Sequence, residues 1–192
     1  CTIFESFGIF INLIQAYIFA ARSDYNFISQ TLSPLIEMCK RAQSHVSLVL
    51  DTKKPSGILA NTVNQSEFQI LQKLLENLGC KYGFNLILTE YQKQQIRSSN
   101  RIQFNYPHKE THCFRGYPIY GSFKQFFDND ADYILHLDCD MIFHETLGFS
   151  WIKEGIRIME ENEDILCVLP RGGAPTKGGS LHQGTTDRKS VV

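Results

Sequence analysis

Short, continuously apolar runs alternate along this chain with segments whose apolar residues recur at helical spacing. Such runs are typical of parallel strands covered on both faces, because a half-exposed strand alternates apolar with polar residues. Regular alternation of strand and helix favours an α/β sandwich with a mostly parallel sheet. The runs interpreted as strands are 7–21, 45–51, 84–90, 133–137 and 164–170.

Four segments between these runs are predicted to be helices, because their apolar residues follow one helical face. They are 29–42, 67–78, 120–127 and 150–162. Segments 92–105 and 108–113 are polar without a clear period and are predicted to be irregular. We expect residues 1–170 to form one domain, a three-layer α/β/α sandwich. Residues 171–192, rich in Gly, Lys and Thr, are expected to be a loop or disordered tail.

The uncharged run 7–21 has three interpretations. It is shorter than the roughly 20 apolar residues of a membrane-spanning helix, and it contains Asn12 and Gln15. The positive flank of a signal peptide is missing. A buried strand is preferred, and a membrane or signal segment and a core helix stay open. Because the chain begins at Cys1, we expect a piece of a longer protein, whose other segments can provide membrane association.

Composition is that of an ordinary globular domain. The 192 residues are 43% hydrophobic and 20% charged, enough for one sizeable core. A net charge of −1 gives no global field for nucleic acid or an anionic membrane, so no nucleic-acid partner is expected. Six cysteines without a CxxC pair favour free thiols in a reducing compartment. The expected location is cytoplasmic, at most peripheral to a membrane.

Two carboxylates, Asp138 and Asp140, directly follow the apolar run 133–137, and apolar residues follow them. In extended chain both point to the same side, about 7 Å apart at Cα. They repel each other unless a cation is present. Mg²⁺ or Mn²⁺ is commonly held by one or two carboxylates together with substrate phosphates. The pattern predicts a divalent-metal site for a diphosphate, since parallel sheets bind ligands at the carboxyl ends of their strands. A plain polar turn is the alternative.

These features resemble the nucleotide-binding half of GT-A glycosyltransferases, especially family 2-like members. The resemblance covers about residues 9–170 and is most specific in "DYILHLDCD". Weaker support comes from "LVLDTKK", from the first strand and its following loop, and from "FRGYPIYGSF". It implies a sugar donor linked to UDP or GDP and an acceptor hydroxyl on a glycan, lipid or protein. That hydroxyl attacks the anomeric carbon as the nucleoside diphosphate leaves.

The resemblance also implies roles for particular residues. The end of the first strand, Ala21 and Arg22, would face the nucleotide. Asp51 and Glu90 would contact the base or ribose, and Arg115 the diphosphate. Asp138 would contact ribose and metal, with Asp140 the more direct ligand of Mn²⁺ or Mg²⁺.

The chain departs from the family pattern in two places. Many members carry Asp-Asp-Gly-Ser after the second strand, where this chain has Asp-Thr-Lys-Lys. The family's catalytic base lies well downstream of the metal motif, and Asp187 stands in the expected tail. The base is therefore expected to be absent, no catalytic residue is assigned, and inverting versus retaining chemistry stays open.

Two other functions fit parts of the sequence. "YILHLDCDMI" also resembles the first motif of haloacid dehalogenase-like phosphatases, where Asp138 would be the nucleophile and Asp140 a general acid. That family carries the motif on its first strand, whereas several elements precede it here. A non-catalytic nucleotide-sugar-binding domain is the third possibility. His136 beside the motif is interpreted as a hydrogen-bonded core histidine, and His112 with Cys113 as loop residues.

Overall fold

The computed structural model describes residues 13–54, 65–106, 109–113 and 115–170. The chain divides into two compact units, 1–143 and 144–192. The elements of the first unit are β1 (Ile14–Ala20), the 3₁₀ helix η1 (Arg22–Asn26), α1 (Ile28–Arg41), β2 (His45–Asp51), α2 (Gln65–Tyr82), β3 (Asn85–Thr89), α3 (Lys93–Phe104), α4 (Tyr120–Phe127) and β4 (Tyr133–Asp138). The second unit contains α5 (Trp151–Glu161).

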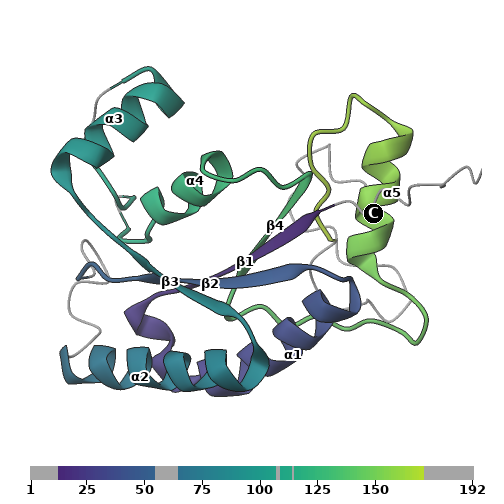
Figure 1. Cartoon of the computed structure of the whole chain (residues 1–192), viewed down its shortest axis with the longest axis horizontal. Helices are drawn as coiled ribbons and strands as arrows, with labels where there is room; N and C mark the ends of the chain where they lie inside the picture. Colours follow the sequence, from purple (N-terminus) through teal and green to yellow (C-terminus); the bar gives the residue numbers. More distant parts are fainter. Residues whose placement is uncertain (1–12, 55–64, 107–108, 114, 171–192) are drawn as a thin grey trace, which may run out of the picture. The chain divides into compact units, whose positions relative to one another are not determined.

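The four strands form one parallel sheet in the order β3-β2-β1-β4 (Figure 1). Strand β1 is internal, with Tyr17 beside Ser47 of β2 and His136 of β4. Ala16 and Ile18 of β1 are fully buried, as expected for a strand covered on both faces. The chain places β2 and β3 on one side of β1 and then β4 on the other. The prediction of an α/β protein with a parallel sheet is therefore confirmed.

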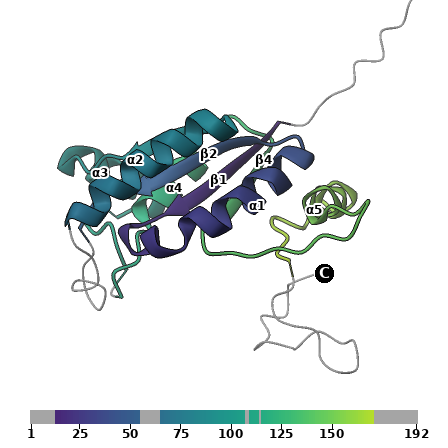
Figure 2. The same ribbon diagram turned by 90° about the horizontal axis from the view of Figure 1, so that it is seen from below.

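Helices lie on both faces of this sheet. Helices α1 and α2 cover one face, and α4 lies on the other (Figures 1 and 2). The inward face of α1 consists of the residues that gave its helical period: Leu32, Leu35, Ile36 and Cys39, all fully or almost fully buried. This arrangement is compatible with a three-layer sandwich.

Helix α4 approaches the sheet closely at Gly121. A Cβ atom at this position would lie 3.0 Å from Thr89 Oγ1 of β3 and 3.8 Å from Val49 Cγ1 of β2. A side chain at this position would press on Thr89, so glycine permits the close approach of the start of α4 to the strands. The residues just before and inside its first turn consequently lie near the carboxyl ends of the sheet.

Two predictions about elements are wrong. Segment 92–105 contains helix α3 rather than an irregular loop. Among the side chains of this helix that the structure describes, Ile96 and Asn100 are the buried ones, so the buried stripe is too narrow to give a visible period. Segment 164–170 is not a strand. Its Leu166 and Leu169 are exposed, and within the described part of the second unit no strand is present to pair with it.

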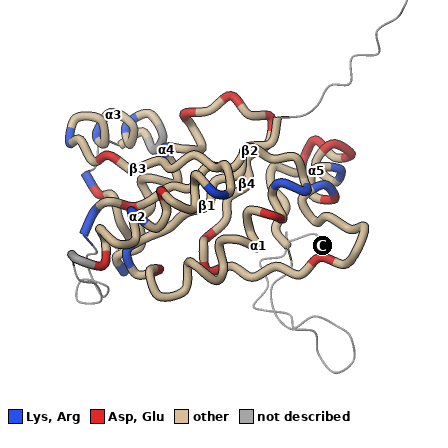
Figure 3. The backbone as a smooth tube through the Cα atoms, turned by 60° about the horizontal axis from the view of Figure 1, so that its bottom comes forward, with Lys and Arg blue, Asp and Glu red and all other residues tan. Residues whose placement is uncertain are grey.

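The apolar run 7–21 contains β1 from Ile14 onward, which confirms its interpretation as a buried strand for that part. Residues 7–12 and the expected tail 171–192 lie outside the described residues. Within the described ranges, no helix has the length and apolar character needed to cross a bilayer. The five cysteines in those ranges are free thiols. Charges of both signs are spread along the described chain (Figure 3).

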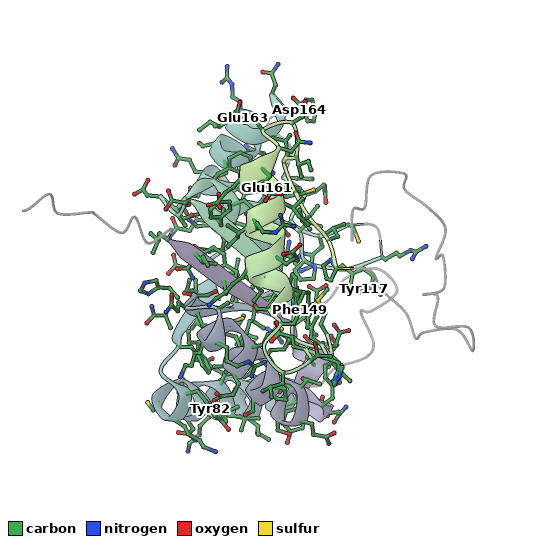
Figure 4. All side chains as sticks on the ribbon, turned by 90° about the vertical axis from the view of Figure 1, so that its right-hand side faces the viewer. Tyr82, Tyr117, Phe149, Glu161, Glu163 and Asp164 are labelled. Atoms are coloured by element: carbon green, nitrogen blue, oxygen red, sulfur yellow. The ribbon has the colours of Figure 1, made fainter. Side chains whose placement is uncertain are left out.

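The second unit is built around α5. Gly155 packs beside Val168, where an added Cβ would make an ordinary contact of 3.6 Å. Arg157 pairs on the outer surface with Glu154 at 2.6 Å and with Glu161 one turn further on. Acidic residues follow at the end of the helix, where Figure 4 labels Glu161, Glu163 and Asp164. The pairs of Arg157 with Glu154 and Glu161 are exposed, and exposed pairs of this kind contribute little to stability.

Candidate functional site

A pocket of about 360 Å³ opens at the carboxyl ends of β1 and β4. Its walls come from the ends of these two strands, from η1 and from the segment that leads into α4. Because strand order reverses between β1 and β4, this is the switch point at which open parallel sheets bind ligands. The lining residues are Phe19, Ala20, Ala21, Ser23, Asp24, Tyr117, Pro118, Ile119, Ser122, His136, Asp138, Cys139 and Asp140.

Asp138 is the last residue of β4, and Asp140 lies in the turn that follows. The backbone N–H of Cys139 donates to Phe19 O at 3.0 Å, which extends the pairing of β4 with β1. The N–H of Met141 donates to Asp138 O at 3.1 Å and closes the turn. The Asp138 side chain is 57% exposed and Asp140 is exposed, whereas Cys139 is 1% exposed. Both acids therefore face the same pocket, and the residue between them faces the protein.

Cys139 is held by a third carboxylate of the pocket. Its thiol donates to Asp24 Oδ2 at 3.0 Å. Asp24 also accepts the N–H of Ala21 at 2.7 Å and the hydroxyl of Ser23 at 2.9 Å. Burial, reinforced by the charges of Asp24, Asp140 and Asp138, raises the pKa of the Cys139 thiol well above its usual range. The thiol therefore stays protonated and acts as a donor.

The donor set of the pocket fits a hard divalent cation that is shared with a ligand. Among the described residues, no three His, Cys, Asp or Glu side chains converge on one point as a complete metal site. Mg²⁺, however, is usually held by one or two carboxylates and completes its octahedron with water and phosphate oxygens. Asp138 and Asp140 supply that number of carboxylates.

An aromatic pair forms another part of the pocket wall. The rings of Phe19 and His136 stack with centroids 4.4 Å apart and planes inclined by 25°, and Phe126 of α4 lies 5.5 Å from His136. His136 Nε2 is 3.6 Å from Asp138 Oδ1. Its Nδ1 has no hydrogen-bond partner within the described part of the structure. His136 is thus half-buried in the pocket wall, and the interpretation as a hydrogen-bonded core histidine is wrong.

Of the two residues expected after the first strand, only Ala21 lines the pocket. Arg22 turns into the protein and is buried. Its guanidinium donates to Thr52 O at 2.6 Å and lies 4.1 Å from the centre of the Phe68 ring. Arg22 therefore connects η1 with the end of β2 and with α2, while the pocket is formed by its neighbours.

Asp51 is also outside the pocket lining, in a buried polar network. Its Oδ2 lies 2.9 Å from His112 Nε2, and its Oδ1 accepts the backbone N–H of Lys53 at 3.0 Å and the hydroxyl of Tyr91. Burial first, and then the negative charge of Asp51 and the hydrogen bond to it, raise the pKa of Tyr91 far above its ordinary value. Tyr91 therefore remains a neutral donor to Asp51.

This network continues to the start of α4. Thr111 Oγ1 lies 2.9 Å from His112 Nδ1 and accepts from Lys53 Nζ at 2.6 Å. The backbone oxygen of Thr111 accepts the N–H groups of Ile119 and Tyr120 at 3.0 and 3.1 Å. The end of β2 is thus linked through side chains to the segment that carries Tyr117, Pro118 and Ile119 into the pocket.

Glu90 and Arg115 are exposed and are not among the lining residues. Arg115 belongs to a tight turn in which the Gly116 N–H donates to Cys113 O at 2.9 Å, with Gly116 at φ 98°. Tyr117, labelled in Figure 4, follows this turn and is 55% exposed. The structure therefore brings Ala21, Asp138 and Asp140 together but leaves Arg22, Asp51, Glu90 and Arg115 outside this pocket.

Several lining residues were not predicted to belong to the site. Period two places His136 on the same strand face as Asp138, but this residue was assigned to the core. Asp24 and Phe19 carry no such local signal, since only the pairing of β1 with β4 brings them to the motif. The sequence of this chain matches no protein-family model and no curated protein.

Proposed function

We propose that this chain is the nucleotide-sugar-binding part of a metal-dependent glycosyltransferase of GT-A type. It would transfer a sugar from a UDP- or GDP-linked donor to an acceptor hydroxyl. One observation carries the proposal: Asp138 and Asp140 line a pocket at the point where the order of an all-parallel sheet reverses. That is the position in which α/β sheets of this kind hold nucleotides.

The charges in the pocket support a metal-dependent mode of binding. Its described lining contains Asp24, Asp138 and Asp140 but neither Lys nor Arg. A diphosphate alone would be repelled by these carboxylates, so Asp138 and Asp140 would bind it through a shared Mn²⁺ or Mg²⁺. When bound, such a cation stabilises the charge that develops on a departing diphosphate. Asp24 is occupied by three donors and stays outside this role.

The remaining walls suit a nucleotide of this kind. Ala20 and Ala21, at the end of β1, line the pocket with small side chains. The stacked rings of Phe19 and His136 offer an aromatic surface, and the volume of about 360 Å³ lies in the range of small-molecule pockets. Contacts of Asp51, Glu90 and Arg115 with the donor stay predictions from the family resemblance.

A thermal-shift panel tests the proposal. Wild type, Asp140→Ala and the control Asp130→Ala, an exposed acid outside the pocket lining, are heated with UDP or GDP, with and without Mn²⁺. We expect nucleotide to stabilise the wild type and the control only when Mn²⁺ is present. Saturation at 100 times the dissociation constant adds about 2.7 kcal/mol. Asp140→Ala should abolish the effect.

Other outcomes separate the alternatives. If neither nucleotide stabilises the wild type with Mn²⁺, the proposal is wrong. Metal-dependent binding without cleavage of any UDP- or GDP-sugar by the full-length protein would instead indicate a non-catalytic binding domain. Release of phosphate from p-nitrophenyl phosphate, lost in Asp138→Asn, would indicate the phosphatase. The phosphatase family carries the motif on its first strand, whereas here it follows β4, the outer strand of the described sheet. This position disfavours the phosphatase alternative.

A further inference from the structure

A buried thiol connects the two segments that form the pocket. Cys139 stands between Asp138 and Asp140 and donates its S–H to Asp24, 115 residues earlier in the chain. We propose that Cys139 and Asp24 are positioning residues that hold the turn after β4 in the shape that directs both flanking carboxylates into the pocket. The inference rests on the proposed function of Asp138 and Asp140.

The turn needs such a contact because its backbone support ends early. Among the described residues, the last hydrogen bond between β4 and β1 is that of the Cys139 N–H with Phe19 O, and one backbone bond of the turn follows it, from Met141 N–H to Asp138 O. Asp138 and Asp140 repel each other before a cation binds, which favours a wider separation of their side chains. The inward-facing thiol of Cys139 opposes that movement, since rotating this residue would break its bond to Asp24.

Asp24 is itself held firmly. It lies in η1 directly after β1, and its two oxygens accept the Ala21 N–H and the Ser23 hydroxyl in addition to the thiol. The bond from Cys139 goes to an ionisable carboxylate, and bonds to charged acceptors are stronger than those to neutral ones. An apolar side chain at position 139 would fill the space but leave Asp24 without this donor. Groups that orient metal ligands in this way typically affect metal affinity by about 10–100-fold.

The test measures the dissociation constant of Mn²⁺ with UDP and with GDP for a set of variants. Cys139→Ala and Asp24→Ala should each weaken Mn²⁺-dependent binding by about 10–100-fold, and Cys139→Ser should restore most of it because a hydroxyl keeps the donor. The double variant should bind no more weakly than Asp24→Ala alone, since both substitutions remove the same bond. Cys39→Ala is the matched control, because Cys39 is equally buried but lies on α1.

A merely structural role predicts a different pattern. Cys139→Ala and Cys39→Ala would then lower the melting temperature alike and leave the affinity for Mn²⁺ and nucleotide within about twofold of wild type. That result would overturn the inference, and so would strictly additive effects of the Cys139 and Asp24 substitutions.

The inference can fail separately from the proposed function. If the wild type binds neither nucleotide with Mn²⁺, the proposed function is wrong, and amide hydrogen exchange decides whether the contact shapes the turn. Exchange at Cys139 and Met141 that is at least tenfold faster in Asp24→Ala than in wild type would support it. Unchanged exchange at these two amides would refute it.

Discussion

Replacing Asp51 with alanine should strongly destabilise the first unit. The substitution removes the acceptor of three donors: His112 Nε2 at 2.9 Å, the Lys53 N–H at 3.0 Å and the Tyr91 hydroxyl. Leaving a buried donor unpaired costs about 1–3 kcal/mol. His112 is buried and Tyr91 is half-buried, while the Lys53 N–H gains access to water through the space that is vacated.

Two unpaired side-chain donors give an expected loss of about 2–6 kcal/mol, a range that includes the roughly 3–5 kcal/mol cost of removing one partner of a buried ionisable pair. This is a large part of the roughly 5–15 kcal/mol that stabilises a typical domain. Tyr91→Phe removes a single donor and should cost about 1 kcal/mol. It keeps the prediction measurable if Asp51→Ala does not fold. The control Asp130→Ala changes an exposed acid and should stay within about 0.5 kcal/mol of wild type.

Urea unfolding followed by circular dichroism measures these differences in unfolding free energy. The comparison is valid if the dependence of that free energy on urea concentration is similar for all variants. A loss below about 1 kcal/mol for Asp51→Ala would refute the reasoning. The carboxylate would then not be satisfied inside the protein. It would be available to contact the base or ribose, as the family resemblance implies.

Three further predictions follow from single contacts. Because the pKa of Tyr91 is raised in the folded state, the free energy of unfolding should be constant below about pH 10 and fall at higher pH. Urea unfolding measured at a series of alkaline pH values should show a smaller fall for Tyr91→Phe than for wild type. Gly121→Ala places a Cβ 3.0 Å from Thr89 Oγ1 and should cost about 1–3 kcal/mol. In contrast, an added Cβ at Gly155 on α5 would lie 3.6 Å from Val168 Cγ1, so Gly155→Ala should stabilise the chain by about 0.5–1 kcal/mol. Equal melting temperatures of the Gly121→Ala and Gly155→Ala variants would contradict these two predictions. Although partial burial opposes it, N–H groups of Tyr117, Arg115 and Gly116 lower the pKa of Cys113. Iodoacetamide mapped by mass spectrometry at pH 7.5 should therefore label Cys113 before buried Cys139, and the reverse order would refute this.

Strands were the most predictable part of the fold. Segment 45–51 coincides with β2, and 84–90 exceeds β3 by one residue at each end. Strand β2 is buried from Val46 onward, and burial on both faces favours an apolar run that is visible in the sequence alone. The same pattern gave a wrong prediction of a strand at 164–170, because an apolar run predicts burial but does not show whether a partner strand is present. Helix α3 was missed for the opposite reason, since its described side chains include few buried ones, Ile96 and Asn100.

The sequence by itself determined that two acids stand at the end of an apolar strand, where a parallel sheet has its ligand-binding edge. That inference needs only local order: an apolar run, two carboxylates and the period of an extended chain. Tertiary structure decided the rest. It paired β4 with β1, brought Asp24 to Cys139 across 115 residues and enclosed Asp51 with His112 across 61. The reason is physical, because the neighbours of a side chain depend on which strands pair, and hydrophobic periodicity carries no information about that choice.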